Sequence, residues 1–347
     1  MTAIQAPRGA FRMPAEWEPH EATWLAWPHE KSDWPGKFAA IPWLYGEIVR
    51  HLARVERVRI LVEDADAEQR VRGILHKCRA DAASVEFMHH PTDRSWIRDY
   101  GPLFVKSAKR GPRSQPSVAA THWRFNGWAK YDNWKRDATA PLTIARRLGI
   151  ERRETGLVME GGSIDVNGAG KLLTTEECLL SDVQARNPGL SRREIERAFA
   201  AHLGVGEVIW LGCGIAGDDT HGHVDDIARF VSRDTVVTVV EPDASDPNHA
   251  PLQENLRRLR ARGDLRVATL PMPEPVYFNG QRLPASYANF YIANGIVLAP
   301  TFADVKDRLA LNILARLFPN REIIGIPCRD LVLGLGTLHC MTQQQPA

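Results

Sequence analysis

The sequence predicts an α/β fold in which one kind of unit repeats along the chain. Segments with helical and with strand periodicity alternate from end to end, which is typical of α/β proteins. Five segments also share one pattern, a polar residue near a glycine followed by a strand-like run. Their polar centres are Asp99, Glu160, His223, Asn289 and Cys340, at intervals of 61, 63, 66 and 51 residues. Such a period indicates a circular array of units, although ordinary α/β proteins can also produce it by chance.

The individual elements follow from the spacing of apolar residues. Helical spacing predicts helices over residues 41–55, 66–78, 191–204, 250–263 and 305–318. Short β-rich runs predict strands over residues 57–63, 84–90, 207–212, 295–300 and 321–327, and a hairpin over 229–242. The helix at 191–204 opens with a capping box, Ser191 to Glu194, and ends at Gly204. No low-complexity linker divides the chain, so residues 1–347 are expected to form a single domain.

Composition narrows the class of protein. The 347 residues are 44% hydrophobic and 25% charged, with a net charge of +2, which is ordinary for a soluble globular protein. This charge gives no electrostatic reason to expect nucleic-acid or membrane binding, and no secretory signal or membrane-spanning stretch occurs. The five cysteines are odd in number and lack CxxC spacing, which argues against a disulfide framework and a structural zinc. A reducing cytoplasm is the expected location.

Cys340 is the candidate nucleophile. It follows His339 in "GLGTLHC", where glycines permit a tight turn. A reactive cysteine is expected in a polar, partly exposed setting, which suits Cys340 better than Cys178 or Cys213, both within apolar runs. The alternative is a buried structural cysteine, the commoner fate of this residue type.

The segment "THGHVDD" supports two interpretations. If it is a strand, His221, His223 and Asp225 share one face and could bind a metal, while Asp226 points the other way. The absence of a second histidine-rich motif argues against this metal site. The other interpretation is an acid–base histidine, His223, beside a carboxylate, with His221 in a turn.

Two further carboxylates occupy comparable places. Asp99 precedes a Gly-Pro turn and Glu160 precedes two glycines. Asp99 could simply pair with its neighbour Arg98, and Glu160 could stabilise a turn. Together, however, three carboxylates around Cys340 would raise the pKa of its thiol, which makes sense only if the substrate is a cation. A guanidinium is planar, permanently charged and recognised bidentately by carboxylates.

Four motifs, "WIRDYGP", "EGGSID", "THGHVDD" and "LHCMTQQ", resemble those of the agmatine deiminase and bacterial peptidylarginine deiminase family of the guanidine-modifying superfamily. They occur in the family's order, and the resemblance covers nearly the whole chain. It implies a five-bladed pseudo-symmetric α/β propeller, the pentein fold. It also implies roles for five residues. Cys340 would be the nucleophile, His223 the general acid and base, Asp99 and Asp225 the carboxylates that hold the guanidinium, and Glu160 the group that orients His223.

The implied reaction is hydrolysis of agmatine to N-carbamoylputrescine and ammonia, a step of putrescine biosynthesis, through an S-alkylthiouronium intermediate. It needs no metal or organic cofactor, and its partner is a small cationic guanidino substrate; a homodimer is compatible with the resemblance. Alternatives are a peptidylarginine or free-arginine deiminase, a metal-dependent hydrolase, and a non-catalytic binding pentein.

The sequence departs from the family at three positions. Leu335 and Thr337 replace residues of the usual GGGNIHC motif, and Asp226 stands where asparagine is common. These departures leave the far end of the substrate open. Trp27, Trp96 and Trp128 are the aromatic residues expected to line the pocket.

Overall fold

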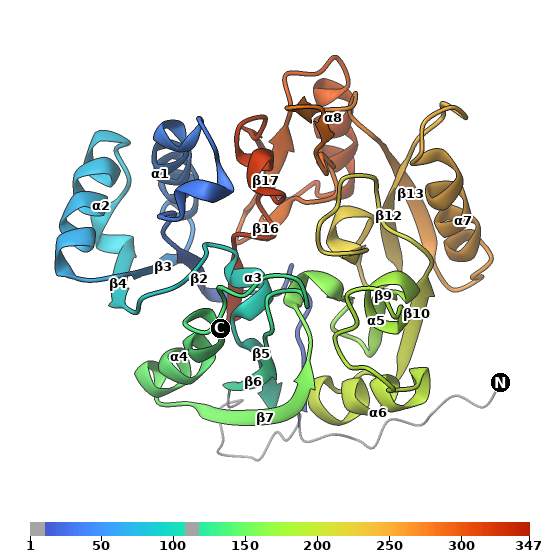
Figure 1. Ribbon diagram of the computed structural model, residues 1–347, viewed down its shortest axis with the longest axis horizontal. Coiled ribbons are helices and arrows are strands. Elements are labelled where there is room, and N and C mark those ends of the chain that lie inside the picture. The colour runs from blue at the N-terminus through green and yellow to red at the C-terminus, as the bar shows by residue number, and fades with distance from the viewer. Residues whose placement is uncertain (1–10, 108–117) are drawn as a thin grey trace.

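The computed structural model describes residues 11–107 and 118–347, and one strand arrangement occurs five times in it (Figure 1). In each of five sheets, a first strand pairs antiparallel with a second, and the second pairs parallel with a third. The repeat that the spacing of the polar centres predicted is therefore a real structural unit.

Four of the sheets follow one another along the chain. Their strands in sheet order are β1 (Phe11–Arg12), β5 (Leu103–Ser107), β6 (Val118–Arg124) and β7 (Glu151–Val158); β8 (Asp165–Val166), β9 (Lys171–Thr175) and β10 (Glu207–Leu211); β11 (Ala228–Ser232), β12 (Thr235–Val240) and β13 (Arg266–Pro271); and β16 (Tyr291–Ala293), β17 (Ile296–Thr301) and β18 (Glu322–Pro327). A small hairpin, β14 (Tyr277–Phe278) with β15 (Gln281–Arg282), lies between the last two.

The fifth sheet joins the two ends of the described chain. Its strands are β19 (Gln343–Pro346), β2 (His20–Ala26), β3 (Arg57–Val62) and β4 (Val85–His89). β19 supplies the antiparallel first strand, and β2 and β3 supply the parallel pair. Because the last strand completes the unit that begins near the N-terminus, the five units close into a ring.

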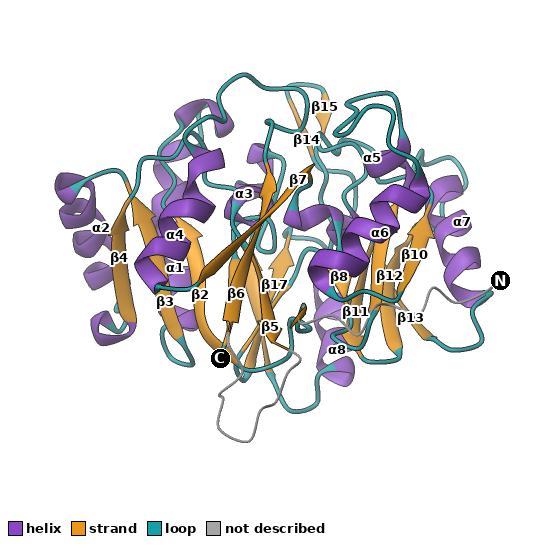
Figure 2. Cartoon of the chain, turned by 90° about the horizontal axis from the view of Figure 1, so that it is seen from below, coloured by secondary structure: helices purple, strands orange, loops and turns teal. Residues whose placement is uncertain are grey.

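Helices make the crossovers between parallel strands, as parallel pairing requires. They are α1 (Ile41–Leu52), α2 (Ala65–Lys77), α4 (Ala140–Leu148), α5 (Glu176–Leu180), α6 (Arg192–Leu203), α7 (His249–Arg260) and α8 (Asp307–Leu317). Most of them lie at the periphery, with the sheets between them and the centre (Figures 1 and 2). A short helix, α3 (Ile97–Tyr100), lies near the centre instead.

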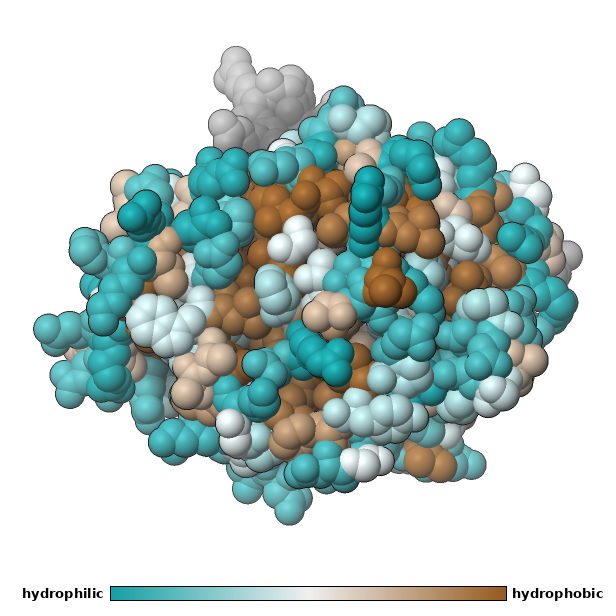
Figure 3. All heavy atoms as spheres, turned by 90° about the horizontal axis from the view of Figure 1, so that it is seen from above, coloured by the Kyte–Doolittle hydropathy of each residue, from teal (hydrophilic) through white to brown (hydrophobic). Residues whose placement is uncertain are grey.

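The elements predicted from periodicity are confirmed, including the hairpin β11–β12. The capping box of α6 forms as predicted, and Gly204 ends that helix in the left-handed conformation. Among the described residues, none of the helices is both long and apolar enough to cross a bilayer. On the face seen in Figure 3, hydrophobic residues gather in patches between hydrophilic ones.

The five polar centres occupy equivalent places in the ring. Asp99, Glu160, His223, Asn289 and Cys340 each lie within five residues of the first strand of a unit, namely β5, β8, β11, β16 and β19. Equivalent turns of a closed ring face a common axis, so these side chains are brought together from five separate parts of the sequence.

Candidate active site

His223 lies at the centre of a buried polar cluster. Its Nδ1 is 3.8 Å from Asp99 Oδ1 and 4.0 Å from Asp225 Oδ1. Its Nε2 is 3.6 Å from Glu160 Oε2. On the other side of Asp225, the Cys340 Sγ lies 3.7 Å from Oδ2. The structure therefore brings together all five residues predicted to be catalytic.

Asn289, the fourth polar centre, holds the sulfur of Cys340. Its Nδ2 donates to Sγ at 3.1 Å. Its Oδ1 accepts hydrogen bonds from the Thr337 hydroxyl at 2.7 Å and the His339 N–H at 3.1 Å, which fix the amide with its donor end toward the sulfur. A donor at this distance favours the thiolate over the thiol.

Two glycine runs let the polar groups approach. A Cβ at Gly162 would lie 2.5 Å from His223 Nδ1 and 2.9 Å from Asp99 Oδ1, so only glycine fits between these side chains. A Cβ at Gly336 would lie 3.0 Å from that of Cys340. Leu335, inside the second run, has φ +67°, a left-handed conformation that costs about 1–2 kcal/mol for a residue with a Cβ. This explains why the family's motif has glycine there.

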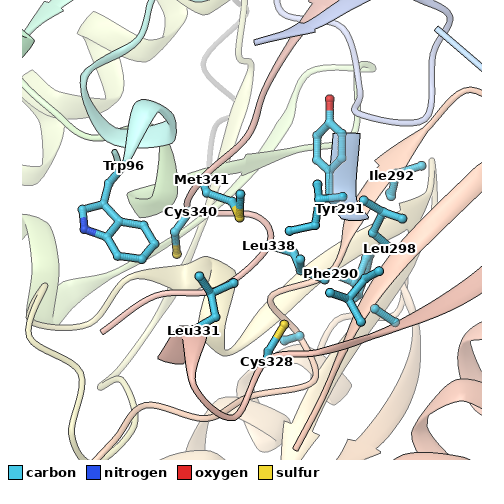
Figure 4. Close-up of a cluster of buried hydrophobic side chains, with 14 of the residues drawn as sticks. Trp96, Phe290, Tyr291, Ile292, Leu298, Cys328, Leu331, Leu338, Cys340 and Met341 are labelled. Carbon is cyan, nitrogen blue, oxygen red and sulfur yellow. The ribbon is translucent and has the colours of Figure 1, made fainter. Parts of the chain in front are cut away.

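Two of the three predicted tryptophans border the site. The Trp128 indole N–H donates to Asp99 Oδ2 at 2.9 Å, and the Gly162 N–H donates to Oδ1 at 3.0 Å, so Asp99 is held at both oxygens. Trp96 lies beside Cys340, whose sulfur is directed into the space between the indole and Leu331 (Figure 4).

Trp27 has a different setting. It packs edge-on against Tyr45 and lines a cavity of about 480 Å³ with Phe38, Leu61 and Ile74. Its predicted contact with substrate stays a prediction, and the structure supplies no hydrogen bond from its indole to the carboxylates of the cluster.

Asp225 is fixed by a histidine. His339 Nδ1 lies 2.7 Å from Asp225 Oδ2, and its Nε2 lies 2.8 Å from Glu16 Oε2. Although burial opposes it, the hydrogen bond and charge of His339 lower the pKa of Asp225. In the same way, Arg229 and His339 overcome burial and lower the pKa of Glu16 well below its usual range. With two ionised carboxylates as acceptors, both ring nitrogens must donate, so His339 is an imidazolium.

His223 differs, because neither of its ring nitrogens has a hydrogen-bond partner within the described residues. Burial disfavours its charged form, but Asp99, Cys178 and Glu160 outweigh burial and raise the pKa of His223 well above its ordinary value. Glu160 in turn contacts the buried Arg186 at 3.1 Å, and Arg186 and His223 lower its pKa to about 2 against the effect of burial. His223 is thus a proton donor with free ring nitrogens.

The remaining charges oppose the thiolate. Burial, then Asp225, Asp226 and Asp99, raise the pKa of Cys340 well above its ordinary value. Burial together with Asp225 and Glu160 raises the pKa of Asp99 to about 6, although His223 acts in the opposite direction. A cation bound among these carboxylates would reverse this effect and favour the thiolate.

The model of the Porphyromonas-type peptidyl-arginine deiminase family matches residues 12–346. The chain belongs to this family. Among its relatives, the agmatine deiminase of Ectopseudomonas mendocina (strain ymp) is 36% identical over all of this chain and 98% of its own. That of Pseudomonas aeruginosa (strain LESB58) is 37% identical over 97% of this chain and 96% of its own.

Solved structures of family members share the fold. C. jejuni agmatine deiminase with substrate bound has a TM-score of 0.88 at 29% identity, and Enterococcus faecalis agmatine deiminase has 0.88 at 30%; each alignment covers 97% of this chain and 96% of the other. An amidinotransferase from Microseira wollei, 12% identical with a TM-score of 0.51 over 95% of both chains, shares the fold alone. The predicted five-bladed α/β propeller, the pentein fold, is confirmed.

One local prediction about "HGHVDD" is wrong. The segment is not a strand here: residues Val224–Asp226 form a 3-10 turn before β11. Asp226 therefore does not point to the opposite face of a strand. It is buried within the cluster, and burial, followed by Asp225 and Asp218, raises its pKa well above the ordinary value. A protonated Asp226 is chemically close to the asparagine that other family members carry.

The geometry also resolves two alternatives. His221 lies 3.1 Å from the Ser181 hydroxyl and 3.8 Å from Glu177, so the metal-binding set of His221, His223 and Asp225 is not assembled in the described part of the chain. Arg98 does not pair with its neighbour Asp99. It contacts Glu16 and Gln344 instead, which leaves Asp99 available.

Two expectations about cysteines are also wrong. Cys340 has a polar environment but is only 6% exposed, whereas a partly exposed setting was expected. Cys213, expected inside an apolar run, is exposed. Cys178 is buried as predicted.

Sequence reasoning missed Glu16 and Arg186, and gave His339 and Asn289 no role. Glu16 and Arg186 lie far in sequence from the residues they contact and carry no local motif, so the single sequence gives no signal for them. Asn289 could have been found from its place in the repeat, which matches that of Glu160 and His223.

Proposed function

We propose that this protein is an agmatine deiminase, a cysteine-dependent hydrolase that converts agmatine and water to N-carbamoylputrescine and ammonia. The observation that carries the proposal is the cluster itself, in which the Cys340 thiol faces Asp99 and Asp225 with His223 between them. The agmatine deiminases of two Pseudomonas-type organisms match this chain over nearly its full length, which supports this substrate class.

Asp99 and Asp225 would bind the guanidinium from two sides. Asp225 Oδ1 is buried and has no hydrogen-bond partner within the described residues, while Oδ2 is occupied by His339. Asp99 accepts one hydrogen bond at each oxygen, so each keeps a further lone pair. The planar fork of a guanidinium supplies the N–H groups that such carboxylates bind.

The first half of the reaction forms the covalent intermediate. Binding of the cation lowers the pKa of Cys340, whose thiol proton leaves to solvent. The thiolate attacks the guanidinium carbon, held in place by the two carboxylates. His223, protonated at this stage, donates its proton to one amino group. The C–N bond then breaks, ammonia leaves, and an S-alkylthiouronium remains on Cys340.

The second half hydrolyses this intermediate. Neutral His223 now accepts a proton from water as the oxygen attacks the same carbon. The C–S bond breaks, Cys340 leaves as a thiolate, and the remaining proton on oxygen leaves to solvent as the ureido carbonyl forms. His223 returns to its protonated state, so the cycle closes without a redox step.

Two buried ion pairs would keep these groups in position. Arg186 holds Glu160, whose carboxylate lies beside His223 Nε2. His339 holds Asp225 and is itself held by Glu16, which also contacts Arg229 at 3.0 Å. Such positioned charges are expected to act by fixing geometry before the substrate arrives.

Burial favours a small substrate over a peptide. Asp99, Asp225 and Cys340 expose between 0% and 6% of their surface, so a free metabolite fits this setting better than an arginine within a protein chain. Free arginine is the remaining competitor, because it differs from agmatine only by a carboxylate on the tail.

The test is turnover of purified protein with EDTA present, on agmatine, free arginine and a C-terminal-arginine peptide in parallel. Ureido product is expected from agmatine first. Cys340→Ala should abolish turnover, and Cys213→Ala, which alters an exposed thiol, should not. Absence of product from all three substrates would overturn the proposal and point to a non-catalytic binding pentein. Loss of activity in EDTA would favour a metal-dependent hydrolase.

Three broader features belong to the proposal. All of residues 1–347 form one catalytic domain, since the cluster needs side chains from all five units. The enzyme acts in the cytoplasm, as its five free thiols favour. A homodimer is the assembly to test by sedimentation, and the exposed Val305 and Leu309 beside α8 offer apolar surface for it.

A further inference from the structure

A second buried thiol lies beside His223. Cys178 of α5, a carboxylate oxygen of Glu160 and a ring nitrogen of His223 all lie within 4.8 Å of one another. Each of the three residues is at most 1% exposed. The proposed reaction uses His223 and Glu160 but gives Cys178 no role, and the ring nitrogens of His223 lack hydrogen-bond partners within the described residues. A ligand that accepts these donors is therefore worth seeking.

The three donors suit one class of ligand. Thiolate, imidazole and carboxylate are the groups that bind Zn²⁺, and three protein ligands with one open position are common for this ion. His223 Nε2 and Glu160 Oε2 are 3.6 Å apart, and tetrahedral coordination with ordinary Zn–N and Zn–O bonds places two such atoms about 3.4 Å apart. Movements of well under about 1 Å would bring this pair to coordination geometry.

Charge balance permits the ion despite the neighbouring Arg186. Without metal, the group contains a protonated His223, a thiol, the Glu160 carboxylate and the Arg186 guanidinium. Binding of Zn²⁺ displaces the proton of His223 and that of the Cys178 thiol. Two positive charges enter and two protons leave, so the net charge of the group is unchanged. Arg186 can keep one oxygen of Glu160 while the ion takes the other.

We propose that Zn²⁺, or another thiol-binding divalent cation, binds Cys178, His223 and Glu160 and inhibits the enzyme. The consequence for activity rests on the proposed function: a metal on His223 occupies the nitrogen lone pair that carries the proton to ammonia and from water. The catalytic thiol Cys340 stays free. The metal is thus an inhibitor of a reaction that does not need one.

The first experiment titrates Zn²⁺ against turnover in a metal-buffered solution, with each variant compared with its own metal-free rate. Loss of one outer-shell partner typically costs about 10–100-fold in metal affinity, so Cys178→Ala, which removes a ligand, should raise the inhibitory Zn²⁺ concentration at least 100-fold. Cys213→Ala, the matched control on an exposed thiol, should leave it unchanged. Equal inhibition of Cys178→Ala and the unaltered enzyme would overturn the proposal.

The second experiment needs no turnover. Co²⁺ added to Cys340→Ala should give the near-ultraviolet charge-transfer band of a thiolate–cobalt bond, and the band should disappear in Cys178→Ala with Cys340 intact. The opposite result places the metal on Cys340 and overturns the proposed site. A Cys178-dependent band in a protein that turns over none of the guanidino substrates would retain the metal site and reject the proposed function.

Discussion

The turn that carries His223 and the turn that carries His339 each place a buried histidine against Asp225, yet the two are held in opposite ways. His339 lies within 2.8 Å of a carboxylate oxygen at both nitrogens. His223 lies 3.6–4.0 Å from three carboxylates and has no hydrogen-bond partner within the described residues. The difference teaches that a fully satisfied histidine positions a site, whereas an unsatisfied one is available to exchange protons.

The largest expected effect tests the free histidine. His223→Gln should lower kcat by about 10²–10⁴-fold, because the proton donor and acceptor is lost. The free energy of unfolding should change by less than about 1 kcal/mol, since no hydrogen bond is broken. Steady-state kinetics and denaturant titration check both. A variant that unfolds easily but keeps kcat would break the contrast between the two histidines.

His339→Gln tests the held histidine. One amide cannot donate to both Asp225 and Glu16, so a buried carboxylate is left unpaired, and the variant should lose about 3–5 kcal/mol of stability. Displacement of Asp225 should lower kcat/KM by about 10²-fold. The pH profile discriminates the two roles. Its limb assigned to His223 should be retained in His339→Gln, and loss of that limb would contradict a positioning role.

The pH dependence sharpens the comparison from the side of the substrate. The pKa of Asp99 is raised to about 6, so this carboxylate is ionised above that pH and becomes neutral below it. Attraction for a guanidinium is therefore present above pH 6, and kcat/KM should fall about tenfold per pH unit as pH decreases below it. Asp99→Asn should lower kcat/KM throughout and remove this inflection. An unchanged inflection in Asp99→Asn would assign it to another group.

The smallest expected effect concerns Asp226. Because its pKa is raised well above the ordinary value, it is already neutral, and Asp226→Asn should change kcat/KM by less than about threefold. Asp225→Asn removes the charge fixed by His339 and should cost far more. Comparable losses in the two variants would show that Asp226 is ionised and takes part in binding the cation.

Much of the fold and the chemistry could be predicted because both depend on local features. Alternating helix and strand patterns, and polar residues at similar places before five strands, gave the repeat. The motifs that carry Asp99, Glu160, His223 and Cys340 pointed to a guanidinium. Asp226 could not be placed, because a strand and a 3-10 turn are equally compatible with its neighbours, and only packing against the other units selects the turn.

The sequence by itself determined the repeated unit, the glycines that allow close approach, and the reactive groups. Only the tertiary structure decided which histidine is fixed and which is free, that Cys340 is buried, and that Cys178 lies beside Glu160 and His223. The physical reason is that these properties depend on distances of 3–4 Å between side chains from different units. Closure of the ring sets those distances, and neither Glu16 nor Arg186 carries a local pattern that reveals its partner.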